Sequence, residues 1–278
     1  MRKPYLRGRG PTFPILDDIV QYEFEPGYVV FTMPSPKRLR VKVGEIVVAD
    51  TVDALVMYES DHLPVYYFPM KDIDEALLMQ SATKTESPYK GVASHFSMNT
   101  GVTLVEDAAW RYLEPVKGCP PIADHISFYW NKMNHWYEED EEIFVHARDP
   151  FRRVDCLPSS RRVQVVLDGE TVAESRHGTF LFETGHPTRY YLPIADTRLD
   201  LLSPSRYISR CPYKGLANYY HLTVKGKRYD NLVWYYADPV HESARIKGLV
   251  CFFNEYVDIL VDGVKQERPA TASSHGYY

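Results

Sequence analysis

The sequence predicts a mainly β protein that contains one small domain twice. Residues 40–130 recur in residues 162–254, and the match holds at a fixed offset of 124 over most of that length. Of the 278 residues, 22 are tyrosine, 20 are proline and 15 are glycine, and such aromatic and turn-forming enrichment favours short strands over long helices. Each copy, at about 120 residues, is long enough to bury a core of its own.

The duplication divides the chain into five segments. They are a basic arm with its lead-in (1–27), a first repeat (28–148), a linker (149–160), a second repeat (161–268) and a flexible tail (269–278). A linker of about ten residues limits how far the repeats can separate, and duplicated domains often preserve an ancestral homodimer contact. We therefore expect the repeats to pack on each other as a pseudo-dimer with approximate two-fold symmetry.

Strands can be placed in order along each repeat. In the second repeat, 162–167 and 170–173 flank Asp168-Gly169, a hairpin signal because both residues tolerate positive φ. The remaining strands are expected at 189–192, 216–224, 232–237 and 249–260, and in the first repeat at 64–68, 92–98, 108–113 and 126–132. One short helix is expected from Asp72 to Leu78, where Asp72 and Glu75 resemble a capping box.

Composition argues against several classes of partner. The formal net charge of −5 gives no electrostatic footprint for nucleic acid. No apolar run reaches the roughly 18 to 20 residues of a membrane span, and no secretory signal is evident. We therefore expect a cytoplasmic protein without nucleic-acid or membrane partners. The local exception is Arg2, Lys3, Arg7 and Arg9, which form either a solvated terminus or a phosphate-binding arm.

Metal and cofactor sites are not predicted. The four cysteines form no C-x-x-C pair, and Cys119, Cys211 and Cys251 fall opposite Ser243, Ser87 and Ser127 of the other repeat. Serine cannot replace a thiolate ligand, so these positions indicate small-residue packing. His62 and His186 are the histidines that both repeats share. Phosphate-binding and dinucleotide-binding glycine loops are absent, and no Gly-x-Ser-x-Gly elbow is present.

Two shared residue types could carry chemistry. Lys90 and Lys214 stand in Pro-Tyr-Lys-Gly motifs, where a lysine can bind a carboxylate or phosphate, act as a base, or simply be solvated. Glu59 and Glu183 each end an apolar run. Such a carboxylate can have a raised pKa and act as acid or base. It can equally accept backbone amides or pair with the lysine.

The shared aromatic residues also admit two interpretations. Trp110 with Tyr112, and Trp234 with Tyr236, are two positions apart, which places each pair on one face of a sheet. Core packing is the default role for such residues. Aromatic side chains also line small-molecule pockets.

Several of these motifs resemble those of the domain of unknown function 427 family, also labelled nucleotidyltransferase-like. They are Asp168-Gly169, Glu183-Thr184-Gly185, Tyr190-Tyr191-Leu192-Pro193, Cys211-Pro212-Tyr213-Lys214-Gly215 and Trp234-Tyr235-Tyr236. The first repeat is similar more loosely, through Glu59, Tyr66, Lys90 and Trp110. The resemblance implies tandem β-tent-like domains, each with two antiparallel sheets leaning over a cleft.

The resemblance also suggests a small-molecule site. Its members would be Glu183, Tyr190, Tyr213, Lys214 and Trp234, with Glu59, Tyr66, Lys90 and Trp110 as the equivalent set. Binding of a small anion, with or without catalysis, is one hypothesis, and a structural or interaction module is the other. Nucleotidyl transfer is least favoured, because the acidic pair Asp72 and Asp74 is replaced by Asp196 and Arg198 in the second repeat.

Overall fold

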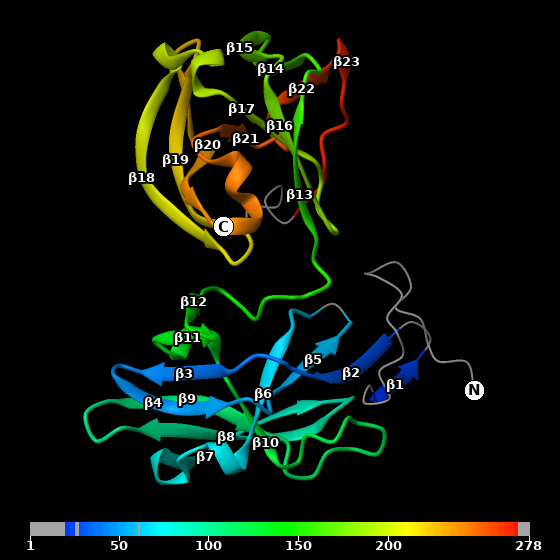
Figure 1. Cartoon of the computed structure of the whole chain (residues 1–278), viewed down its shortest axis with the longest axis vertical. Helices are drawn as coiled ribbons and strands as arrows, with labels where there is room; N and C mark the ends of the chain where they lie inside the picture. The colour runs from blue at the N-terminus through cyan, green and yellow to red at the C-terminus, as the bar shows by residue number, and fades with distance from the viewer. Residues whose placement is uncertain (1–19, 26–27, 61, 272–278) are drawn as a thin grey trace. The chain divides into compact units, whose positions relative to one another are not determined.

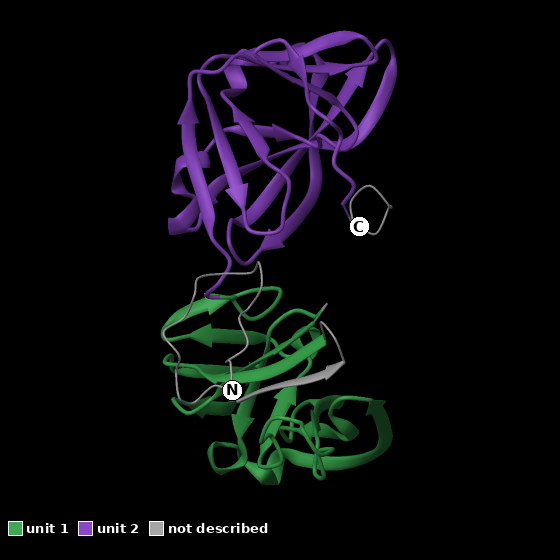
Figure 2. Cartoon of the chain, turned by 90° about the vertical axis from the view of Figure 1, so that its right-hand side faces the viewer, with its two compact units in different colours: residues 1–149 green, residues 150–278 purple. Residues whose placement is uncertain are grey.

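The computed structural model describes residues 20–25, 28–60 and 62–271, and it confirms a mainly β fold. Two compact units are formed, residues 1–149 and residues 150–278 (Figure 2). Each unit contains one larger and one smaller antiparallel sheet. The predicted basic arm before residue 20 and the tail after residue 271 lie outside the described residues.

The first unit has an eight-stranded and a four-stranded sheet (Figure 1). In spatial order, the larger sheet contains β1 (Val20–Glu25), β2 (Tyr28–Pro34), β5 (Leu55–Glu59), β6 (Val65–Pro69), β10 (His125–Phe128), β9 (Leu104–Arg111), β8 (Gly91–Asn99) and β7 (Leu78–Ser87). The smaller sheet contains β12 (Glu141–Ile143), β11 (His135–Glu138), β3 (Leu39–Val43) and β4 (Ile46–Thr51).

The second unit has a seven-stranded and a four-stranded sheet. In spatial order, the larger sheet contains β13 (Val154–Ser159), β16 (Gly178–Glu183), β17 (Arg189–Leu192), β21 (Val250–Phe252), β20 (Lys227–Pro239), β19 (Gly215–Val224) and β18 (Leu202–Cys211). The smaller sheet contains β15 (Glu170–Ser175), β14 (Val163–Leu167), β22 (Asp258–Val261) and β23 (Val264–Lys265).

The two larger sheets have the same strand order once β1 is set aside, which confirms the predicted duplication. β2 corresponds to β13, β5 to β16, and the edge strand β7 to β18. β1 pairs with the outer edge of β2. Among the described strands, the equivalent strand β13 is the edge strand of its sheet. There Arg245 donates to the carbonyl of Cys156, and Pro158 has no N–H to offer to another strand.

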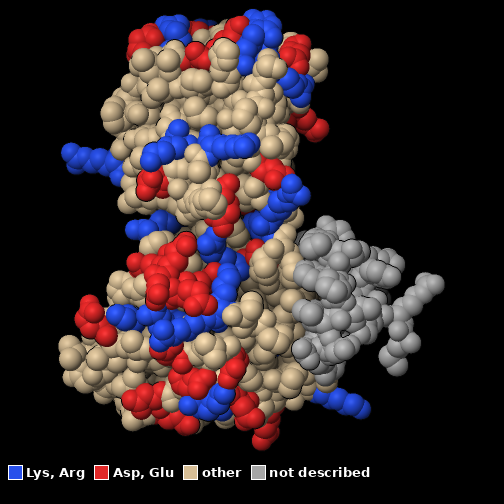
Figure 3. Space-filling view, viewed as in Figure 1, with Lys and Arg blue, Asp and Glu red and all other residues tan. Residues whose placement is uncertain are grey.

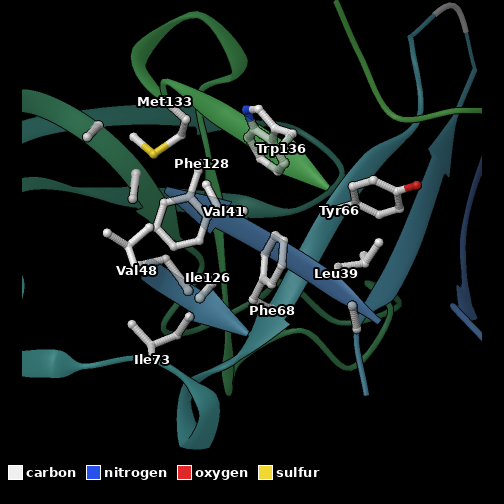
Figure 4. Packing of buried hydrophobic residues seen from close by; sticks show 14 of the residues in the cluster. Leu39, Val41, Val48, Tyr66, Phe68, Ile73, Ile126, Phe128, Met133 and Trp136 are labelled. Carbon is white, nitrogen blue, oxygen red and sulfur yellow. The ribbon is translucent and has the colours of Figure 1, made fainter. Parts of the chain in front are cut away.

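The main core of each unit lies between its two sheets. Buried and partly exposed residues alternate along β3 and β14, as expected when one face of a strand meets the core. In the first unit, Val41 and Trp136 from the smaller sheet meet Phe68, Ile126 and Phe128 from the larger one (Figure 4). In the second unit, a matching cluster joins β14 and β22 to β19, β20 and β21.

A second apolar cluster lies on the other face of each larger sheet. In the first unit it includes Val30, Tyr67, Tyr112 and Ile122. Its counterpart in the second unit includes Leu181, Tyr191, Trp234, Tyr236 and Ile246, the last of these from the 3-10 segment η6 (His241–Ile246). Strands of the larger sheets are therefore covered on both faces. The glutamate and lysine of each repeat lie at the ends of these strands.

The short helix expected from Asp72 is present as two successive 3-10 turns, η1 (Met70–Asp72) and η2 (Glu75–Leu77). Asp74, rather than Asp72, caps the second turn by accepting from the backbone N–H of Ala76. Asp72 instead accepts a 2.6 Å hydrogen bond from the Thr51 hydroxyl. The second repeat has the corresponding turns η4 (Ile194–Asp196) and η5 (Leu199–Leu201), and the first repeat has a further turn, η3 (Trp130–Lys132).

Two further segments differ from their predicted form. The single strand expected over 249–260 is two strands, β21 and β22, which belong to different sheets. β13 lies inside residues 149–160, the segment predicted as the linker, and pairs with β16 along its length. Short strands that cross from one sheet to the other cannot be separated by hydrophobic pattern alone.

Surface charge is mixed in sign on the viewed face of both units, with acidic and basic side chains next to each other (Figure 3). The acidic run after Tyr137 is part of the β11–β12 hairpin, and Glu138 is buried where Tyr66 and Lys37 donate to it. None of the helical segments within the described ranges has the length and hydropathy of a transmembrane helix.

Candidate functional site

The lysine that both repeats share is held by a three-residue hairpin loop. Ser87 pairs with Gly91, and Cys211 pairs with Gly215, which leaves Pro-Tyr-Lys as the loop. Gly91 and Gly215 have φ of +97° and +99°, a conformation that side chains disfavour. The lysine carbonyl accepts from a backbone N–H of the following segment, at 3.3 Å in the first repeat and 3.2 Å in the second. The hairpin loop and the hydrogen bond to the lysine carbonyl together fix the lysine backbone.

The glutamate that both repeats share lies at the end of β5 in the first repeat and of β16 in the second, and it pairs with that lysine. The Nζ atom of Lys214 is 2.5 Å from Oε2 of Glu183, and Lys90 makes the same ion pair with Glu59. The side chains are 13% and 5% exposed in the second repeat and 10% each in the first. The lysines are thus not solvated turn residues. Of the alternatives left open by the sequence, the structure shows the glutamate paired with the lysine.

A third residue, different in the two repeats, completes each cluster. In the first repeat, the Tyr28 hydroxyl donates to Oε1 of Glu59 at 3.0 Å, and its ring stacks on Tyr89 with centroids 4.0 Å apart. In the second repeat, Nη1 of Arg152 donates to Oε1 of Glu183 at 3.1 Å. Its guanidinium carbon lies 5.3 Å from the centroid of the Tyr213 ring. An aromatic hydroxyl and a cation therefore occupy equivalent positions.

Arg152 was not among the predicted site residues. It falls within the predicted linker, and the first repeat has tyrosine at the same place, so a search for shared residues passes over it. The offset of 124 does connect Tyr28 with Arg152. A change from a neutral to a charged residue beside a shared glutamate is the signal that could have identified it.

This difference changes the charge of the cluster. Lys90 balances Glu59 in the first repeat, while Lys214 and Arg152 face the single carboxylate of Glu183 in the second. Burial opposes ionisation of Glu183, but the charge of Lys214 and the hydrogen bonds from Lys214 and Arg152 outweigh it and lower its pKa. Glu183 is therefore an anion at neutral pH, and the hypothesis of a raised pKa does not apply to it.

Arg152 keeps unused hydrogen-bonding capacity. Its Nη1 contacts Glu183 and also Nδ1 of His186, the latter at 2.9 Å. Its Nε is buried and has no hydrogen-bond partner among the described residues. Buried polar groups normally find partners, so this Nε is a donor that a water or a ligand could use.

The shared tryptophans have a packing role. Tyr67 meets Trp110 edge to face, and Tyr191 meets Trp234 in the same way, with centroids 6.5 Å and 6.2 Å apart. Nε1 of Trp234 donates to the Tyr191 hydroxyl at 2.9 Å. The guanidinium carbon of Arg189 also lies over the Trp234 ring, 5.4 Å from its centroid. Both indoles therefore belong to the apolar cluster.

Tyr66 and Tyr190 do not join the glutamate and lysine. The hydroxyl of Tyr66 donates to buried Glu138 at 2.6 Å, and Tyr190 packs edge to face on Phe180 at 4.9 Å. Both rings lie in the core between the two sheets. Successive side chains on a strand point to opposite faces, so the neighbouring tyrosine of each pair faces the second cluster instead.

The cysteines are unpaired and mostly buried. Burial raises the pKa of Cys119 to about 11 and that of Cys251 to about 12, which keeps both thiols protonated at neutral pH. Their serine counterparts Ser243 and Ser127 are buried too and donate to backbone carbonyls at 2.9 Å and 2.8 Å. These positions suit small side chains. The absence of a bound metal or cofactor stays a prediction from the sequence.

Comparison with known families gives one match that occurs twice. A family model described as Domain of unknown function (DUF427) matches residues 32–139 and again residues 155–263. Both matches contain the glutamate and the lysine of their repeat, while Tyr28 and Arg152 lie just before them. No curated protein matches the chain.

Proposed function

The chain belongs to the DUF427 family, and we propose that its second repeat binds a small oxyanion beside Arg152. The proposal rests on the charge of the second cluster, which contains one more cationic side chain than carboxylates. Two cationic side chains share one carboxylate in the second repeat, whereas the first repeat has a neutral cluster of the same geometry. A partly buried net positive charge favours an anion from solution.

The chemistry of Arg152 favours an oxyanion as the ligand. A guanidinium presents donors in a fixed plane and matches the paired oxygens of carboxylate, phosphate or sulfate. Nη1 is occupied by Glu183 and His186, so the edge that carries the unpartnered Nε is the one a ligand would use. The Arg152 side chain is 22% exposed, so part of the guanidinium side chain already meets solvent.

The roles of the predicted site residues change accordingly. Lys214 holds Glu183 as an anion, and the pair positions Arg152, so Lys214 supports the ligand site without anchoring the ligand alone. The guanidinium of Arg152 packs over the ring of Tyr213. Tyr190 and Trp234 stabilise the fold around this site. The arrangement supports binding and does not indicate a particular reaction.

The first repeat fits the alternative of a structural module. Both oxygens of Glu59 are engaged, one by Lys90 and one by Tyr28, and the charges balance. We propose that Glu59, Lys90 and Trp110 maintain the fold there, with Tyr66 in the core. Packing of the repeats as a pseudo-dimer and a cytoplasmic location stay predictions from the sequence.

Isothermal calorimetry with sulfate, inorganic phosphate and a nucleoside monophosphate tests the proposal. A charge-assisted hydrogen bond contributes about 1.5 to 3 kcal/mol, so Arg152→Gln is expected to weaken binding about tenfold to a hundredfold. Tyr28→Phe is the matched control, because it alters the equivalent residue of the first repeat, and it should leave affinity unchanged. Equal affinities in wild type and Arg152→Gln would show that the anion does not bind there.

A further inference from the structure

We infer that His186 makes oxyanion binding beside Arg152 dependent on pH, with tighter binding when the imidazole is protonated. The inference rests on the proposed function, because it concerns the same site. It starts from one nitrogen atom, Nδ1 of His186, which lies within hydrogen-bond distance of two groups. These are Nη1 of Arg152 at 2.9 Å and the backbone carbonyl of Thr184 at 3.3 Å.

The two contacts require opposite protonation of Nδ1. An arginine N–H only donates, so Nδ1 must carry a lone pair to accept from Arg152. A carbonyl oxygen only accepts, so Nδ1 must carry a proton to bond to Thr184. Nδ1 therefore serves one of the two partners at a time. The shorter distance to Arg152 assigns the neutral imidazole, with its proton on Nε2, to the contact that the structure shows.

In the first repeat, the equivalent histidine bonds to the backbone carbonyl instead. Nδ1 of His62, the counterpart of His186, lies 2.8 Å from the carbonyl of Ser60, the counterpart of Thr184. Nδ1 of His62 must donate in that contact. Tyr28 stands in place of the arginine there, so the competing donor of the second repeat is replaced by a tyrosine. The same loop geometry thus accommodates a histidine that bonds to the carbonyl when the arginine is absent.

Protonation of His186 changes the charge and the donors of the site. The charged groups that face the imidazole are Arg152 and Glu183, with Lys214 beyond the carboxylate, and the rest of the exposed ring meets solvent. An imidazolium cannot accept from Arg152, so Nδ1 donates to Thr184 and an N–H of Arg152 is released. Three cations then surround one carboxylate. Both changes favour a bound oxyanion.

Histidine is the side-chain type that can gain a proton between about pH 8 and pH 5. Proton binding and anion binding then stabilise each other, because linkage between two ligands is reciprocal. One added positive charge at the rim of a site is worth about 1 kcal/mol, which corresponds to about a fivefold change in affinity. We expect wild type to bind sulfate about fivefold more tightly at pH 5.5 than at pH 8.

Calorimetry with sulfate at both pH values and constant ionic strength tests the inference. Sulfate keeps its charge of −2 over this range, so the ligand itself does not titrate. His186→Gln should remove the additional tightening at pH 5.5, while the matched control His62→Gln should keep it. An unchanged pH dependence in His186→Gln would overturn the role of His186 and leave the proposed function intact. Absence of sulfate binding at either pH in wild type would overturn the proposed function.

Nitrogen NMR of the histidine side chains gives a readout that needs no ligand. At pH 8 the proton of His186 should reside on Nε2 in wild type. In Arg152→Gln the proton should shift toward Nδ1, since the competing donor is weakened and the Thr184 carbonyl remains. A proton on Nδ1 of His186 in wild type at pH 8 would contradict the inference, whatever the calorimetry shows.

Discussion

Removal of the shared lysine should destabilise the two repeats to different extents. Lys90→Met leaves Glu59 with a single neutral donor, the Tyr28 hydroxyl. Lys214→Met leaves Glu183 with the cation Arg152 at 3.1 Å. The two substitutions are chemically identical and lie at equivalent loops. Any difference between them therefore reports on Tyr28 and Arg152.

The magnitude follows from burial. Both glutamate side chains are almost fully buried, and breaking a buried ion pair by removal of one partner costs about 3 to 5 kcal/mol. That cost is expected for Lys90→Met. In Lys214→Met the remaining charge–charge hydrogen bond offsets much of it, which leaves a loss of about 1 to 2 kcal/mol. The double variant Glu59→Gln/Lys90→Met should recover most of the loss, because no uncompensated charge remains.

Hydrogen exchange with mass spectrometry measures the two repeats separately in the intact chain. A free-energy change of about 1.4 kcal/mol corresponds to a tenfold change in exchange rate. Amides of β5 and β8 should therefore exchange about a hundredfold to several thousandfold faster in Lys90→Met. Amides of β16 and β19 should exchange about five- to thirtyfold faster in Lys214→Met. Equal acceleration in the two variants would refute the compensating role of Arg152. No acceleration in Lys90→Met would refute the buried ion pair itself.

Three further predictions concern acid, thiols and a sheet edge. The pKa of Glu183 is lowered from its usual 4.5, so its contribution to stability is present above about pH 4.5 and is lost as pH falls through the folded value; acid unfolding curves of Glu183→Gln should lack this component. A thiol reagent at pH 8 should label half-exposed Cys211 well before Cys119 and Cys251, and fast labelling of Cys251 would contradict its burial. Deletion of residues 1–25 should expose the edge of β2 and cause self-association, measurable by light scattering; a monodisperse variant would show that this edge does not need β1.

The repeat offset predicted the duplication because it aligns residues that must occupy the same place, and the two larger sheets share one strand order accordingly. The two-sheet architecture was expected from the resemblance to the family. The long edge strands β7 and β18 were missed, since edge strands contact the core on one side and carry mostly polar residues, as in Leu78–Ser87. The division of 249–260 between two sheets was missed for a different reason: a chain that crosses between sheets keeps the same apolar character.

The glutamate–lysine cluster was predicted in part, for the residues that both repeats keep. Glu183 and Lys214 form an ion pair, which was one of the alternatives that the sequence left open. Tyr213 contacts Arg152, which in turn bonds to Glu183. Tyr190 was grouped with them because it is shared, but a shared residue can equally serve the core on the opposite face. Arg152 was passed over because the repeats differ there. A comparison of repeats identifies what the fold requires, whereas a difference between them can identify what one repeat does alone.

The most direct test of the central claim is a crystal structure with selenate, whose position can be located by anomalous scattering. In wild type, the anion is expected within hydrogen-bond distance of Arg152 in the second repeat. In the double variant Tyr28→Arg/Arg152→Tyr, which exchanges the two residues that differ between the clusters, the anion should instead occupy the first repeat. Selenate that is absent from Arg152 in wild type, or that stays in the second repeat after the exchange, would contradict the account.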